Sequence, residues 1–562
     1  MSTHLTYIFL GLGSGAVIAS LALGLVVTHR ASNVINFAHG AIGAYLAFVY
    51  YELRSSGDLI QPIIGLPGRI HIVDRPTVAT ALAISMIMAC LLGAACYAFI
   101  FKRLRAAPAL ARVVASLGLM TYLIGVMGVR ISGIGVTTLS LEGPLPTDLV
   151  DLGGVRSPAD RYWLTAIVLV ATAAVWAVSR FTNFGLATRA TAENEAGAVL
   201  VGISPDRLGY LNWMLACSLA GFAMILAAPI VRLDPSTTPL LIVPALGAAL
   251  LGRFRAIWLT VLTGFGIGML QSWLQNVQAD WTWLPDVGLQ QGVPFAIILI
   301  VLLWRTDRLP GRGTVMGAGL PPAPDPVHTV AITTGLVVMA GVGLLLLDSE
   351  WRLGIIVSAI AAIIGLSVVV LTGLVGQISL LTYALSGIAA FGMVRATEEL
   401  GLGFPFGAVL GVAAAVVIGT LIGLPAIRVR GLTLAVASLA AAVAVEELVF
   451  KWSWFSGGLN GSRAESPTFF GLDLGISAAG TAYPREAFGM LVLVALLLAM
   501  ILVVNLRRSA TGRQWLAVRA NERAAEAIGI SATRVKLTAC LLYTSPSPRD
   551  HLSYLVCRLL LE

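Results

Sequence analysis

The sequence predicts an all-α protein, a polytopic transmembrane helical bundle that contains two homologous membrane units. Apolar residues make up 58% of the 562 residues and charged residues only 11%, whereas soluble domains carry about 25% charged residues. Apolar runs follow one another along the chain, and one charged motif occurs once in each half. This composition argues against a soluble enzyme, because too few charges are present to cover a water-soluble surface.

The first half contains a series of apolar runs, and a helix needs about 20 such residues to cross ~30 Å of hydrocarbon. The shorter runs are candidates for re-entrant segments. We expect helices near 7–28, 34–51, 78–101, 113–130, 162–179, 208–231, 238–251, 256–275 and 291–304.

Charge predicts which loops face the cytoplasm. Basic residues gather in 101–112 (FKRLRAAPALAR) and 304–313 (WRTDRLPGRG), so these loops are expected to be cytoplasmic. The segments 142–154 and 275–286 carry acidic residues and no basic ones, and are expected on the opposite side. Membrane proteins concentrate excess positive charge in their cytoplasmic loops. The net charge of +8 is therefore no indication that the chain binds nucleic acid.

A break in the apolar pattern divides the chain. Residues 307–329 contain five prolines and four glycines, which favour an extended linker over a helix. We therefore expect a first membrane unit at 1–306 and a second at 330–540. Apolar runs resume in the second unit near 330–347, 353–372, 378–396, 405–424, 431–450 and 487–505.

An internal repeat indicates that the two units are homologous. NEAGAVLVGISPDR (194–207) matches NERAAEAIGISATR (521–534), and at the same offset Gly185 matches Gly512. VASL occurs at 114–117 and again at 436–439. A looser match joins VINFAHGAIGAY from Val34 to QISLLTYALSGIAAF from Gln377. Different offsets are expected when loop lengths differ between related units.

The repeat also predicts that the second unit is incomplete. The first unit continues through further apolar runs after Arg207, whereas only a short tail follows Arg534. In that tail, residues 541–562 contain Pro546, Pro548 and charged residues, and no span fits them. We expect that authentic sequence ends near Cys540 and that 541–562 is a non-native tail; the alternative is a divergent natural terminus.

The repeated motif is typical of a cytoplasmic helix that lies across the membrane face. It follows a span, carries charge and ends in Gly-Ile-Ser, which stops a helix. Two equivalent helices of this kind suit docking of a motor with two equivalent subunits; the alternative is an ordinary linker helix. The motor must be separate, because a P-loop needs GK[ST], and the only lysines, Lys102, Lys451 and Lys536, precede Arg, Trp and Leu.

No pattern for covalent chemistry or metal binding is present in the sequence. The five cysteines are scattered without CxxC spacing or paired histidines. We therefore predict no catalytic residues, no metal and no cofactor.

These motifs together resemble the permeases of branched-chain amino acid ABC importers, with two membrane subunits fused in tandem. The similarity covers about residues 5–540. In the first unit it is carried by NVINFAHGAIGAY (33–45), LRAAPALARVVASLGL (104–119) and RATAENEAGAVLVGISPDR (189–207). In the second it is carried by LTGLVGQISLLTYALSGIAAFG (371–392), LPAIRVRGLTLAVASLA (424–440) and VRANERAAEAIGISATRVKL (518–537).

The resemblance implies a multi-pass protein of the bacterial inner membrane. Its implied partners are the lipid bilayer, two ATP-binding cassette ATPase subunits, a periplasmic substrate-binding protein and a small-molecule amino acid. The resemblance also assigns coupling to the ATPases to Glu193, Asn194, Glu195, Gly202, Asn521, Glu522 and Gly529.

Two departures from the family pattern bear on the substrate. The family usually has Ser-Leu-Gly-His where this chain has Ser379, Leu380, Leu381 and Thr382. A Gly-rich turn of the family is replaced by LGRFRAIW (251–258), which places arginines at a helix junction. Besides branched-chain or other neutral amino acids, urea or short amides therefore remain alternative substrates.

Polar residues within the apolar runs are candidates for the substrate pathway, because buried polar groups in lipid tend to face a cavity or another helix. Two pairs begin spans, Asn36 with His39 and Ser379 with Thr382. The alternative role for the first pair is a hydrogen bond at a helix start. Glu446 and Glu447 more simply occupy the interface, because a lysine and a tryptophan follow closely.

The predicted mechanism is alternating access powered by the separate ATPases. The competing prediction is an ion-coupled secondary transporter. That class requires charged residues at mid-span, of which the sequence offers few, and it leaves the repeated helices unexplained.

Overall fold

The computed structural model forms two compact units, each described here by itself. The first contains the residues through Val301 and the second the helices from Thr329 onward. The structure describes residues 2–32, 35–63, 65–74, 76–105, 107, 109–132, 143–152, 155–231, 233–235, 237–280, 288–304, 329–377, 379–426, 432–457, 466–469, 472–477, 483–532, 534–535 and 538–539. Almost all of the predicted linker, the predicted tail, Trp281 and Trp283 lie outside these residues.

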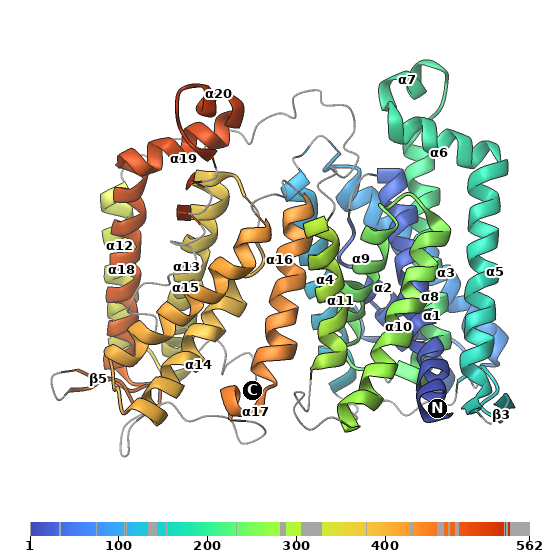
Figure 1. Cartoon of the computed structure of the whole chain (residues 1–562), viewed down its shortest axis with the longest axis horizontal. Coiled ribbons are helices and arrows are strands. Elements are labelled where there is room, and N and C mark those ends of the chain that lie inside the picture. Colours follow the sequence, from blue (N-terminus) through green and yellow to red (C-terminus); the bar gives the residue numbers. More distant parts are fainter. Residues whose placement is uncertain are drawn as a thin grey trace. The chain divides into compact units, whose positions relative to one another are not determined.

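The first unit is helical, with two short antiparallel hairpins (Figure 1). Its helices are α1 (Ser2–Ser32), α2 (His39–Ser56), α3 (Val78–Cys96), α4 (Ala109–Ser132), α5 (Ala159–Phe181), α6 (Asn183–Glu193), α7 (Glu195–Leu200), α8 (Pro205–Val231), α9 (Ile242–Leu251), α10 (Ile257–Asp280) and α11 (Leu289–Trp304). A π-helical turn, η1 (Tyr97–Phe101), extends α3, and a 3₁₀ turn, η2 (Thr238–Leu241), precedes α9. The strands are β1 (Asp58–Ile60), β2 (Arg69–His71), β3 (Leu149–Leu152) and β4 (Val155–Pro158).

The second unit is also helical. Its helices are α12 (Thr329–Leu346), α13 (Ser349–Val368), α14 (Thr382–Leu400), α15 (Phe406–Ala426), α16 (Leu432–Val445), α17 (Ser453–Ser456), α18 (Glu486–Arg508), α19 (Ala510–Ala520) and α20 (Glu522–Ala527). The π-helical turns η3 (Val369–Val375) and η4 (Glu446–Phe450) extend α13 and α16. A short hairpin joins β5 (Thr468–Phe469) to β6 (Leu472–Asp473).

The prediction of an all-α polytopic membrane protein is confirmed. Within the described residues, nine helices are long and apolar enough to cross a membrane. Their outward surfaces are apolar: Val170 on α5 is 69% exposed and Leu421 on α15 is 63% exposed. Such side chains suit lipid rather than water. The protein is therefore a multi-pass integral membrane protein.

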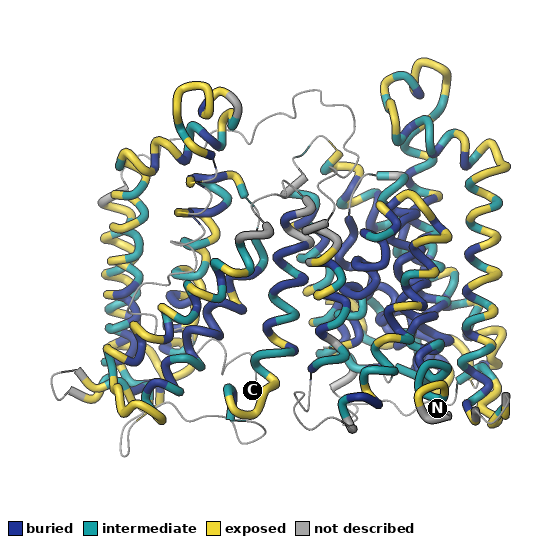
Figure 2. Tube along the Cα trace, viewed as in Figure 1, coloured by how far each residue is buried: buried dark blue, intermediate teal, exposed yellow. Residues whose placement is uncertain are grey.

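The core of the first unit is built around α1 and α2 (Figure 2). Helix α1 packs most extensively on α10, and its residues 15–28 are buried almost without interruption. The approach is close because glycines face each other: a Cβ on Gly11 would lie 2.6 Å from Met269 Cα, and one on Gly264 would lie 2.6 Å from Ala19 Cα. Small residues at this spacing let membrane helices pack backbone to backbone.

Helix α2 is enclosed by protein, which explains its mixed composition. Every residue from His39 to Leu53 is buried. Glu52, near the end of the helix, is paired with Arg69 of β2 at 3.3 Å. The predicted span at 34–51 begins later than expected, because a turn at Asn36 precedes the first helical residue.

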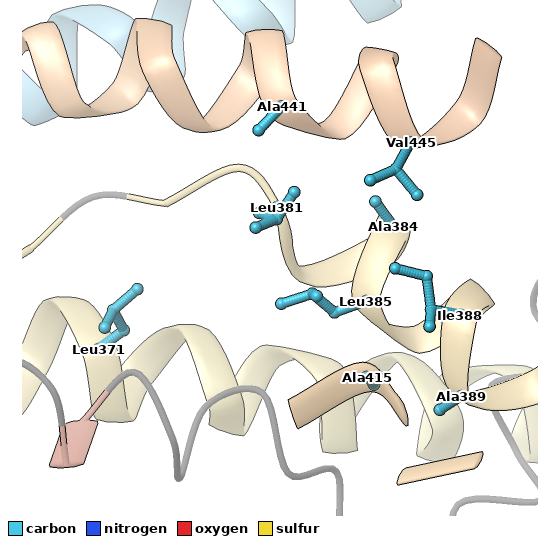
Figure 3. Close-up of a cluster of buried hydrophobic side chains, with 9 residues drawn as sticks. All are labelled: Leu371, Leu381, Ala384, Leu385, Ile388, Ala389, Ala415, Ala441 and Val445. Atoms are coloured by element: carbon cyan, nitrogen blue, oxygen red, sulfur yellow. The ribbon is translucent and has the colours of Figure 1, made fainter. Parts of the chain in front are cut away.

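The second unit has its best-packed region where α14 crosses α15. A Cβ on Gly411 would collide with the carbonyl oxygen of Ala389. Figure 3 shows the neighbouring apolar cluster, to which η3, α14, α15 and α16 all contribute. Leu381, the residue before α14, belongs to this cluster, so apolar packing fixes the start of that helix.

Candidate functional site

The coupling segment predicted in the first unit consists of α6 and α7, at the far end of α5 (Figure 1). Thr182 caps α6 by accepting a hydrogen bond from the N–H of Gly185 at 3.2 Å. A Cβ on Gly185 would collide with the carbonyl oxygen of Ser179, so this turn requires glycine. The chain therefore leaves the end of α5 in a sharp turn.

Asn194 separates α6 from α7. Its backbone is extended, with φ −145° and ψ 99°, which ends α6. Its side-chain oxygen accepts a hydrogen bond from the N–H of Gly197 at 2.9 Å and so caps α7. At the other end, Gly202 has φ 82°, and Ile203 N–H donates to Ala198 O at 3.0 Å. This closure is the left-handed stop that glycine permits.

The second unit repeats these contacts in α19 and α20. Ser509 accepts from the N–H of Gly512 at 3.1 Å, and Asn521 accepts from the N–H of Ala524 at 3.1 Å. Gly529 has φ 88° and ends α20 as Gly202 ends α7. The sequence repeat is thus also a repeat of backbone geometry and of caps.

The tips of the two short helices are apolar and exposed. Leu200 is 87% exposed and Val201 is 73% exposed, and Ile528 in the second unit is 74% exposed. Glu193 is exposed as well, whereas Glu522 is half-buried. Exposed apolar residues beyond the ends of the spans suit contact with another protein.

Ion pairs hold α7 and the start of α8 against the loop that follows η1. Arg105 lies 3.1 Å from Glu195 and 3.1 Å from Asp206, and Lys102 lies 3.1 Å from Asp206. The basic loop predicted at 101–112 is therefore at the same end of the unit as α7. Figure 1 shows β3, which carries Asp151 of the acidic loop, at the opposite end of this unit.

A different contact supports the segment in the second unit. Arg519 of α19 donates a hydrogen bond to the carbonyl oxygen of Gly373 in η3. Trp515 of α19 is 1% exposed and packs in a cluster with Val370, Leu374 and Val518. Packing on η3 thus fixes the orientation of α19.

The polar pair predicted in the first unit lies at the start of α2. Asn36 and His39 are both fully buried. Asn36 Oδ1 accepts from the N–H of Ala38 at 3.1 Å. Asn36 Nδ2 and both ring nitrogens of His39 make no hydrogen bond within the described part of the chain. A Cβ on Gly24 of α1 would collide with the imidazole, so the ring fills the space that this glycine leaves.

The pair predicted in the second unit occupies the equivalent place. Ser379 Oγ accepts from the N–H of Leu381 at 3.3 Å, the same turn that Asn36 makes. Thr382 is the first residue of α14, as His39 is the first of α2. Ser438, in the second VASL segment, accepts from the N–H of Leu380 at 2.9 Å. The two pairs thus begin matching helices, each within its own unit.

Other sequence candidates fall near helix ends. Glu447 pairs with Lys451 at 2.7 Å, and Trp452 is 47% exposed, as at an interface. Arg253 and Arg255 lie at the junction of α9 and α10, where Arg253 has φ 54°. No group of histidines, cysteines or acids that could hold a metal is found among the described residues.

Sequence reasoning missed the caps Thr182 and Ser509 and the ion pairs of Arg105. A signal for the caps was available, because a hydroxyl residue precedes each matched glycine by three positions. No comparable sequence pattern predicts the ion pairs of Arg105, because they join residues far apart in the chain.

Comparisons with known proteins agree with the geometry. The model of the family described as branched-chain amino acid transport system permease component matches residues 7–302 and again 352–544. The high-affinity branched-chain amino acid transport permease LivM of Salmonella typhimurium is 35% identical over 197 residues, which is 32% of this chain and 45% of LivM. This match therefore spans less than half of LivM.

Two further relatives are similar over longer stretches. The probable branched-chain amino acid transport permease LivH of Methanocaldococcus jannaschii is 26% identical over 46% of this chain and 78% of its own length. The permease BraD of Pseudomonas aeruginosa is 25% identical over 54% of this chain and 95% of its own length.

Proposed function

The chain belongs to the family of branched-chain amino acid transport permeases, and from this membership we propose that it is the membrane component of an ABC importer. Its substrates are branched-chain or other neutral amino acids, and its location is the bacterial inner membrane. Two family matches in one chain support a tandem fusion of two permease units, which we assign to 1–306 and 330–540.

The observation that carries the proposal is the repetition of the coupling segment. α6 with α7, and α19 with α20, share their caps and their glycine stops. Each has an exposed apolar tip. Two equivalent helices of this kind suit two equivalent ATPase subunits, whose closure would move Glu193, Asn194, Glu195 and Gly202 in one unit and Asn521, Glu522 and Gly529 in the other.

Charge placement supports a neutral substrate and an external energy source. Four charged residues are buried in the described part of the chain, all of them near helix ends: Glu52, Arg352 and Glu447 each lie close to an opposite charge, and Asp160 lies in the first turn of α5. We assign Asn36, His39, Ser379 and Thr382 to the substrate pathway, because polar groups at helix starts can meet a zwitterion without net charge. A periplasmic binding protein would deliver the substrate.

Uptake by the purified chain in vesicles tests this function. The chain is reconstituted with two ATP-binding cassette ATPase subunits and a periplasmic binding protein of a branched-chain amino acid importer, and uptake of leucine, urea and acetamide is measured. We expect ATP-dependent leucine uptake. L200S and I528S together should abolish ATPase co-purification, because they remove the apolar tips.

The matched control is L262S, which removes a leucine that is 59% exposed on α10, away from the coupling segments. It should leave ATPase binding unchanged. Uptake driven by an ion gradient in the absence of any ATPase would overturn the proposal in favour of a secondary transporter. Uptake of urea or acetamide but not leucine would correct the substrate class.

A further inference from the structure

A pocket in the first unit lies beneath α6. It is a shallow pocket, partly open to the surface, between α1, α5, α6, α8 and the start of α10. Apolar side chains form much of its wall, among them Val27, Val175 and Ile257. Val178, also in the wall, is 40% exposed, so the pocket reaches the lipid-facing surface of α5.

Arginines mark one end of this pocket. Arg30, near the end of α1, and Arg189, on α6, both line it. Arg30 donates a hydrogen bond to the carbonyl oxygen of Arg255, and the positive charges of Arg189 and Arg255 both act on Arg30. Among the ion pairs of the described residues, none involves these three arginines. Three like charges therefore meet without a neutralising carboxylate.

The second unit fills the equivalent position. Thr188 lines the pocket, and the repeat that matches Gly185 with Gly512 matches Thr188 with Trp515. Trp515 is almost completely buried. Arg30 likewise corresponds to Gly373 when Asn36 is matched with Ser379. The first unit thus has a small side chain and an arginine where the second has a large side chain and a glycine.

We propose that this pocket binds an anionic phospholipid. The phosphate lies against Arg30 and Arg189, Arg255 adds positive charge beside Arg30, and an acyl chain runs along Val175 and Val178. The position suits a lipid headgroup, because α6 begins where α5 leaves the membrane, at the end where cytoplasmic basic residues gather. Basic pockets between membrane helices on this side are known to suit acidic headgroups.

Lipid retention by the purified full-length chain tests the proposal without any ATPase or substrate. The chain is placed in nanodiscs containing phosphatidylglycerol and phosphatidylcholine, extracted gently, and the bound lipids are counted by native mass spectrometry. We expect preferential retention of phosphatidylglycerol. R189Q should lower that preference about fivefold. T188W, which copies the second unit, should abolish it by filling the pocket.

The matched control is R180Q, which removes an exposed arginine at the same end of α5 that does not line the pocket. An equal loss in R180Q would show a general surface-charge effect and overturn the proposal. Displacement of the lipid by millimolar inorganic phosphate, with phosphate itself retained, would identify an ion site instead. If T188W does not fold, comparing phosphatidylglycerol retention in R189Q and R255Q with that in R180Q still tests whether the pocket binds the lipid.

Discussion

Gly268 of α10 lies so close to Gly15 of α1 that a side chain on Gly268 would collide with the backbone of Gly15. This contact belongs to the packing of α1 on α10, the most extensive helix–helix contact of the first unit. Gly11 and Gly264 make similar close approaches on either side of it. The two helices therefore pack through their backbones. A larger residue at any of these glycines would therefore clash with the facing helix.

Replacing Gly268 by valine should separate α1 from α10 and destabilise the first unit by about 1–3 kcal/mol or more. The effect is measured by heating the detergent-solubilised chain and using size-exclusion chromatography to monitor its thermal unfolding. G266A is the control, because a Cβ on Gly266 meets nothing within 4 Å. Equal melting temperatures for G268V and G266A would refute this view of the packing.

The Arg105 ion pairs should contribute modestly to the position of α7. R105Q should lower stability by about 0.2–1 kcal/mol, because Arg105 and its two acidic partners, Glu195 and Asp206, are all partly exposed. A double-mutant cycle with E195Q isolates one of the two pairs. A coupling energy of zero would mean that Glu195 does not hold α7 to the loop.

His39 offers a way to separate a functional role from a structural one. Because its ring nitrogens are buried without hydrogen bonds, H39L should leave stability unchanged or raise it by about 1 kcal/mol. If His39 contacts substrate, uptake should nevertheless fall at least about tenfold, equivalent to 1.4 kcal/mol. S85A is the control, because Ser85 Oγ is also buried without a partner but has no assigned role. Normal uptake by H39L would remove His39 from the pathway.

The β1–β2 hairpin should depend on pH. Hydrogen bonds from His71 to Asp58 at 2.9 Å and to Asp74 at 3.0 Å raise the pKa of His71 above its ordinary value. The folded hairpin thus holds the proton more tightly than the unfolded one. Its stabilisation is complete below the ordinary pKa, about 6.5, and is lost as pH rises through the raised pKa.

An NMR titration of His71, together with hydrogen exchange of residues 58–71 on both sides of that pH range, measures this effect. D58N should bring the pKa of His71 back toward its ordinary value. Exchange rates that do not change with pH, once intrinsic exchange is corrected for, would contradict the prediction.

Much of the architecture can be predicted from the sequence, because a helix that crosses lipid needs an apolar run of sufficient length. Apolar run length predicted helices such as α3 and α18 closely, and the recurring Asn-Glu and Gly-Ile-Ser located the two repeated helical segments, α6 with α7 and α19 with α20. The start of α2 was missed, because the segment before His39 is as apolar as a helix and only the side-chain hydrogen bond of Asn36 shows that residues 36–38 form a turn. The hairpins were missed because their strands are too short to show alternation.

Contacts between distant residues account for the rest. Nothing in the sequence indicates that Arg105 reaches Glu195, or that Gly24 makes space for His39. Such facts depend on how helices cross, which hydropathy does not encode. The sequence shows that Asn36, His39, Ser379 and Thr382 are polar residues within apolar runs. Only the fold shows that Asn36 and Ser379 form the same turn.

The shared backbone of the two predicted coupling segments has a consequence for recognition. A protein that meets α7 and one that meets α20 encounter the same caps and the same left-handed glycine stop. Discrimination between the two must therefore rest on side chains, among them Val-Leu-Val at 199–201 against Glu-Ala-Ile at 526–528. Exchanging these two triplets would exchange the side chains at the exposed tips while leaving the caps and the glycine stops in place.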